Sequence, residues 1–140
     1  MKNTICGIMG LIGGAVASAF GGWSAGLTTL LIFMAIDYLS GLIVAGVFHK
    51  SPKSEGGALE SRAGWKGLVR KGMTLLIVLV GCRLDILLGV TYIRDALVVA
   101  FCANELISIT ENAGLMGVPI PEALKEAIDL LKNSKEKTKQ

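Results

Sequence analysis

The chain has 140 residues, enough for one compact unit, of which 52% are hydrophobic and 18% charged. Its mean hydropathy is +0.61, and this composition is unusual for a soluble domain. Between Lys2 and Lys50 the only charged residue is Asp37, and so long an apolar stretch exceeds the roughly 20 residues of one bilayer crossing. The chain is therefore predicted to be an integral membrane protein.

Four apolar segments follow one another, near residues 4–22, 26–48, 72–90 and 96–118. Backbone amides in lipid must be paired within the protein, so these segments are predicted to be helices, the last ending before Pro119. The expected fold is all-α: a small polytopic membrane protein with three or four transmembrane helices, depending on whether residues 4–22 span. The alternative for residues 4–22 is a cleaved signal peptide, but cleavage would leave no soluble domain to export.

The first segment has the composition of a helix that packs closely. Four small residues recur at every fourth position, and this spacing lets helix backbones approach one another in lipid; they are Gly10, Gly14, Ser18 and Gly22. Gly41 is a further small residue, in the second segment. Met9 also offers a second start, which would give a shorter product without Lys2.

Residues 49–71 form a polar loop with six basic and two acidic residues, a surplus of four positive charges. Residues 1–118 are thus predicted to be a transmembrane domain and 119–140 a tail. In the tail, Leu124, Ile128 and Leu131 repeat at i, i+4, i+7, which predicts a short amphipathic helix. Lys2, the loop and the tail hold nearly all extramembrane Lys and Arg, and only Arg94 lies opposite, so the loop and C-terminus are predicted to be cytoplasmic. The surplus of positive charge does not imply a nucleic-acid partner, because the anionic inner leaflet of the membrane attracts basic residues equally well.

Three charged residues interrupt the second and third segments: Asp37, Arg83 and Asp85. Ionisable side chains inside a membrane are expensive and mark functional positions. Arg83 has two interpretations, since it either extends to the outer surface or pairs with an acid such as Asp37.

The fourth segment carries a polar stripe. At 100° per residue, five side chains fall within an arc of about 120°, and Thr110 lies off it. A charge at the centre of a helix costs about 2.5–3.5 kcal/mol on insertion scales, so the stripe is not expected to face lipid. Three interpretations of the stripe are possible. It lines an aqueous path between several copies, it forms a seam of hydrogen bonds between helices without water, or it belongs to an amphipathic helix that lies along the membrane–water interface. Its members are Asn104, Glu105, Ser108, Glu111 and Asn112.

The sequence contains no pattern typical of catalysis, and no enzyme activity, metal or cofactor is predicted. Three cysteines lie in apolar stretches without metal spacing, and are expected to be reduced packing residues. They are Cys6, Cys82 and Cys102.

Several of these residues resemble the phage holin family that includes the clostridial toxin-secretion holins. Asp37-Tyr-Leu-Ser-Gly41 is similar to its Asp-Tyr-(Leu/Ile)-Thr-Gly signature, with Ser40 in place of threonine. Ser61, Gly64, Gly67-Leu68 and Lys71 match its loop-to-helix entry. The longest match comprises Asn104-Glu105, Ser108-Ile109, Glu111-Asn112 and Gly117-Val-Pro-Ile-Pro121. The resemblance covers roughly residues 28–125, and the N-terminal segment has no such signature.

The resemblance implies a holin of the bacterial inner membrane. Such a protein oligomerises and opens lesions that release an endolysin or a toxin, and so times lysis or secretion. The motif residues carried over are Asp37, Tyr38, Gly41, Glu105, Ser108, Glu111 and Asn112. Two alternatives remain: an antiholin of the same fold, or a small four-helix ion or proton-coupled transporter, in which Asp37, Arg83 and the glutamates form a relay.

Overall fold

The computed structural model describes the backbone of residues 1–137 and the side chains of residues 1–134, and five helices make up this part of the chain. They are α1 (Lys2–Ala19), α2 (Ala25–Gly46), α3 (Ser61–Leu88), α4 (Ile93–Leu115) and α5 (Glu122–Lys137). No strand occurs within residues 1–137. The predicted all-α class is confirmed.

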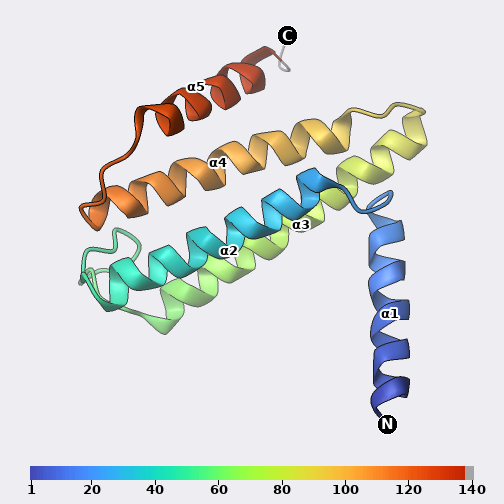
Figure 1. Cartoon of the computed structure of the whole chain (residues 1–140), viewed down its shortest axis with the longest axis horizontal. Coiled ribbons are helices and arrows are strands. Elements are labelled where there is room, and N and C mark those ends of the chain that lie inside the picture. The colour runs from blue at the N-terminus through green and yellow to red at the C-terminus, as the bar shows by residue number, and fades with distance from the viewer. Residues whose placement is uncertain (138–140) are drawn as a thin grey trace.

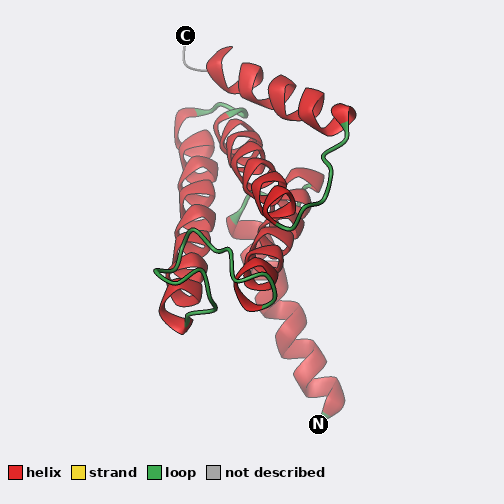
Figure 2. Cartoon of the chain, turned by 90° about the vertical axis from the view of Figure 1, so that its left-hand side faces the viewer, coloured by secondary structure: helices red, strands yellow, loops and turns green. Residues whose placement is uncertain are grey.

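Helices α2, α3 and α4 pack along their lengths into a three-helix bundle, in which α4 makes its most extensive contact with α2 (Figures 1 and 2). The shared core is apolar and draws on all three helices. Leu30 and Val78 are fully buried. The other buried members of this core are Leu27, Met34, Val98 and Cys102.

The charged residue Asp85 lies in the last turn of α3 and caps α4. Its carboxylate accepts hydrogen bonds from the backbone N–H groups of Ile93 at 2.8 Å and Arg94 at 3.0 Å. These are first-turn amides that have no partner within their own helix. Gly89 ends α3 with φ 67, a left-handed conformation that glycine adopts without a Cβ penalty. Asp85 is thus held by the backbone of α4, and no ion pair within residues 1–134 includes it.

We expect Asp85→Ala to lower the free energy of unfolding by about 1 kcal/mol, the usual effect of losing an N-cap acceptor. Urea or SDS titration of the purified protein in detergent, followed by far-ultraviolet circular dichroism, measures this difference. Asp129→Ala, at an exposed position of α5, is the matched control. An equal effect of the two substitutions would contradict the capping role.

The N-terminal helix α1 stands away from the bundle (Figure 1). None of its residues is buried, and a Cβ added at Gly10 or Gly14 would meet no atom within 4 Å. Gly10 and Gly14 of the predicted stripe therefore pack against no other helix within residues 1–134, whereas the Gly22 carbonyl oxygen accepts a hydrogen bond from Arg94 at 3.3 Å. The role of the stripe in packing stays a prediction. Gly41 differs, since a Cβ there would lie 3.8 Å from the side-chain nitrogen of Asn112, at the α2–α4 contact.

Helix α3 begins at Ser61, well before the predicted helix at residues 72–90, so the second half of the predicted loop 49–71 is helical. Hydropathy marks only the apolar part of a helix, whereas residues 61–71 are basic and glycine-rich. Among the helices of residues 1–137, α2, with 22 residues and a hydropathy of 2.0, is the one that is long and apolar enough by itself to cross a membrane. The amphipathic helix predicted for the tail is present as α5, and its Ile128 is buried.

Candidate functional site: a polar network between three helices

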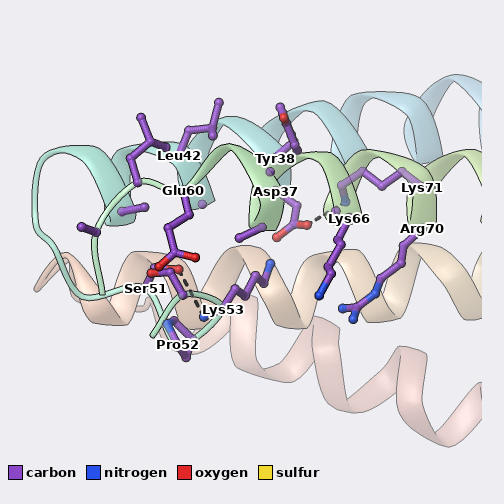
Figure 3. Close-up of a pocket in the computed structure, with 18 of the residues that line it drawn as sticks. Asp37, Tyr38, Leu42, Ser51, Pro52, Lys53, Glu60, Lys66, Arg70 and Lys71 are labelled. Carbon is purple, nitrogen blue, oxygen red and sulfur yellow. Dashed lines mark hydrogen bonds and ion pairs between the residues drawn. The ribbon is translucent and has the colours of Figure 1, made fainter. Parts of the chain in front are cut away.

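One lysine joins two carboxylates from different helices in the middle of the bundle. The ammonium of Lys71 on α3 donates to Oδ2 of Asp37 on α2 at 2.7 Å and to Oε2 of Glu105 on α4 at 2.5 Å. The three side chains are only 14%, 7% and 13% exposed. Figure 3 shows Lys71 reaching across to Asp37. The charges therefore link all three bundle helices at one level.

Asn112, one of only two buried polar residues among residues 1–134, extends the network on its α2 side. Its side-chain nitrogen donates to Oδ1 of Asp37 at 3.2 Å and to Oγ of Ser40 at 2.8 Å. The Ser40 hydroxyl in turn donates to the Asp37 carbonyl oxygen at 3.1 Å. Buried polar groups need such partners, because leaving one without a hydrogen bond costs about 1–3 kcal/mol.

Tyr38, beside Asp37, fixes where α2 meets α3. A Cβ added at Gly64 would lie 3.4 Å from the Tyr38 hydroxyl, and one at Gly67 would lie 3.8 Å from the ring. The two glycines therefore leave room on α3 for the tyrosine ring. Lys71 follows Gly67 by one turn on the same face, which brings its ammonium to Asp37.

With all three groups ionised, the network holds two negative charges against one positive charge. Taking such charges out of water costs several kcal/mol per ion, which is recovered only through close pairing and additional hydrogen bonds. The arrangement provides no nucleophile paired with a base. The network can hold the three helices in one register. Its ion pairs break when the helices separate, and they weaken when one of the three groups loses its charge.

The structure divides the predicted stripe on α4 between two surroundings. Glu105, Ser108 and Asn112 follow one another at i, i+3, i+7 and lie on the partly or fully buried side, whereas Asn104 and Glu111 are exposed. The hydroxyl of Thr110, which lies off the stripe, donates to the Leu106 carbonyl at 2.7 Å. Within a single copy, the buried part of the stripe is a seam between helices.

Arg83 is exposed, and no ion pair within residues 1–134 includes it. Of its two interpretations, pairing with Asp37 is therefore wrong for this structure. The sequence does not predict Lys71 as a site residue, because its hydropathy assigns it to the loop 49–71. A signal was available: Gly64, Gly67 and Lys71 fall on one helical face, which indicates that the helix starts before the apolar run.

Comparison with known proteins identifies the family. The sequence model of the bacteriophage holin family matches residues 14–133. An uncharacterized 14.9 kDa protein from Clostridium perfringens, from the nagH 3′ region, is 42% identical over 83% of each chain. An uncharacterized protein from Halalkalibacterium halodurans is 39% identical over 91% of this chain and 93% of its own.

A phage protein is also among the relatives. A probable holin of Bacillus phage phi105 is 32% identical over 76% of this chain and 74% of its own length. No solved structure shows a significant match. The family match spans the helices that carry Asp37, Lys71, Glu105 and Asn112. The chain belongs to the bacteriophage holin family.

Proposed function

We propose that this protein is a holin that accumulates in the bacterial inner membrane, oligomerises, and opens lesions through which an endolysin or a toxin leaves the cytoplasm. Family membership implies a membrane location and a holin-like role. The relative from phage phi105, described as a probable holin, supports the lytic function. The observation that carries the proposal is a charged network placed in the middle of three helices of a holin-family chain.

The depth of the network supports a multi-pass topology. Asp37 lies nine residues before the end of α2, Glu105 ten before the end of α4, and Lys71 ten after the start of α3. At 1.5 Å per residue, each lies about 14–15 Å from the same end of the bundle, roughly half of a 30 Å hydrocarbon core. We therefore propose that α2, α3 and α4 cross the membrane and that the loop and C-terminal tail are cytoplasmic, with three or four spans in total depending on whether α1 crosses.

The closed and open states would differ in where these charges find partners. Within one copy, Lys71 neutralises part of the charge of Asp37 and Glu105, so a compact monomer is tolerated in lipid. Separation of the helices would leave charges that need water or new partners, and a lesion wall provides both. The exposed Glu111 on α4 and the exposed Gly10 and Gly14 on α1 are available to other copies. Rising copy number then favours the assembled state.

We expect induction of this protein alone in bacteria to cause abrupt loss of viability, collapse of membrane potential and release of a cytoplasmic reporter protein. Glu105→Gln should delay the onset, because removing one carboxylate leaves a balanced Lys71–Asp37 pair and a more stable closed state. Glu111→Gln should shift onset less, since Glu111 lies outside the network. The three readouts are followed in one culture, with equal membrane levels checked by immunoblot.

Glu122→Gln is the control, because Glu122 forms an exposed pair with Lys125 on α5 at 3.0 Å, outside the bundle. Continued growth with intact membranes would contradict the holin function and favour an antiholin. Ion flux without killing or protein release would favour the transporter. Identical onset for the wild type and Glu105→Gln would show that the network does not set the timing.

A further inference from the structure

A cavity of about 510 Å³ lies between α2, the first half of α3 and the loop that connects them (Figure 3). This volume falls within the range of small-molecule sites. One wall is apolar and includes Leu42, Ala45 and Leu59. The other carries positive charge, so the cavity has the two-sided chemistry of an amphipathic ligand.

Three cationic side chains line this cavity in addition to Lys71: Lys53 from the loop, and Lys66 and Arg70 from α3. Lys66 and Arg70 are one turn apart and extend from the same side of α3, while Lys53 extends toward them (Figure 3). No ion pair within residues 1–134 includes any of the three. Two acids in the lining, Asp37 and Glu105, are already bound to Lys71.

Glu60 is the remaining acid in the lining, so the cations that are not used by the network outnumber it three to one. Arg and Lys are the side chains that bind phosphate, and the planar guanidinium of Arg binds two phosphate oxygens at once. The charge of the cavity is therefore complementary to a phosphodiester. Its apolar wall is complementary to the glycerol and upper acyl carbons beside such a group.

Lys66 and Arg70 lie on α3 between its loop end and the level of the charged network. Lys66 lies about 8 Å and Arg70 about 14 Å from the start of the helix at 1.5 Å per residue, and both long side chains can extend toward the membrane surface. The cytoplasmic leaflet is rich in anionic lipid, and basic pockets between transmembrane helices on that side bind anionic headgroups. A soluble phosphate compound would gain nothing from the apolar wall.

We propose that this cavity binds the phosphodiester headgroup of an anionic membrane lipid, with Lys53, Lys66 and Arg70 holding the phosphate. This ligand site goes beyond lesion formation. It depends on membrane insertion, as inferred from the family, and not on lysis. Binding there would join the loop to α2 and α3 beside the charged network.

The test uses the full chain with Trp23→Phe, which leaves Trp65, next to Lys66, as the single tryptophan. The protein is reconstituted into phosphatidylcholine bilayers with increasing fractions of phosphatidylglycerol brominated on its acyl chains, at physiological salt. Quenching of Trp65 measures how strongly phosphatidylglycerol is enriched beside the cavity. Brominated phosphatidylcholine gives the reference for a lipid without net charge.

We expect phosphatidylglycerol to be enriched over phosphatidylcholine, and each of Lys66→Gln and Arg70→Gln to reduce that preference about fivefold, the effect of one basic residue at an anionic surface. Lys66→Arg should keep the preference. Arg62→Gln is the matched control, because Arg62 is exposed on the same helix but does not line the cavity. Circular dichroism verifies that each variant keeps its helix content.

Equal quenching by the two brominated lipids, or equal loss in Lys66→Gln and Arg62→Gln, would overturn the proposal. Displacement of the brominated lipid by millimolar glycerol phosphate would also overturn it and assign the site to a soluble phosphate compound. Because lipid binding is measured in preformed bilayers, a failure of the lysis experiment leaves the binding result unaffected. A failure to bind lipid likewise leaves the lysis result unaffected.

Discussion

Replacing Lys71 with methionine is expected to lower the free energy of unfolding by about 3–5 kcal/mol, the effect of removing one partner from a buried charge pair. The substitution leaves Asp37 and Glu105 facing each other without the cation that both contact at 2.7 and 2.5 Å. Methionine has nearly the shape of the lysine stem, so the decrease in the free energy of unfolding comes from the lost charge and not from lost packing. Reversible SDS unfolding in mixed micelles, followed by circular dichroism, measures it.

Two further variants separate charge from other causes. Lys66→Met, at an exposed position five residues earlier on α3, should change stability by less than about 0.5 kcal/mol. Combining Lys71→Met with Asp37→Asn and Glu105→Gln should recover much of the loss, because replacing a whole buried ion group by neutral residues is often nearly neutral. Equal effects of Lys71→Met and Lys66→Met would show that the network does not stabilise the bundle.

Gly81→Val is expected to destabilise the protein by about 1–3 kcal/mol through overpacking. Gly81 is buried where α3 meets α4, and a Cβ there would overlap Cδ1 of Leu97 and lie 3.5 Å from the Cα of Arg94. The Leu97 methyl group can rotate away, so Gly81→Ala should be tolerated better. The additional methyl groups of valine meet the backbone of Arg94, which cannot move without shifting α4.

Gly72→Val is the matched control on the same helix, because Gly72 is exposed and a Cβ there would meet no atom within 4 Å. The same SDS titration compares Gly81→Val, Gly81→Ala and Gly72→Val. If Gly72→Val were as destabilising as Gly81→Val, the effect would come from introducing valine anywhere in α3. The close approach of α3 and α4 would then not be its cause.

The polar residues of α4 lie in two different surroundings. Glu105 and Asn112 are held by Lys71, Asp37 and Ser40 within the same copy. Glu111 is on the exposed side of the same helix. In the assembly that we propose, Glu111 is therefore at the surface from the start, whereas Glu105 and Asn112 become accessible only if the bundle rearranges.

The sequence by itself determined the all-α class, the apolar character of α2, the amphipathic α5 and the family, because these depend on composition, periodicity and local motifs. It also identified Asp37, Glu105 and Asn112 as polar residues out of place in apolar segments. Periodicity assigns each residue to a face of its own helix, but it does not say which helix lies opposite.

Only the tertiary structure decided the partners. Lys71 rather than Arg83 pairs with Asp37, because the Tyr38 ring fits over Gly64 and Gly67 and sets the register of α3 against α2. Asp85 caps α4, because Gly89 turns the chain back toward it. Both outcomes depend on contacts between residues distant in sequence, where packing of one helix against another selects among charges that hydropathy alone treats as equivalent.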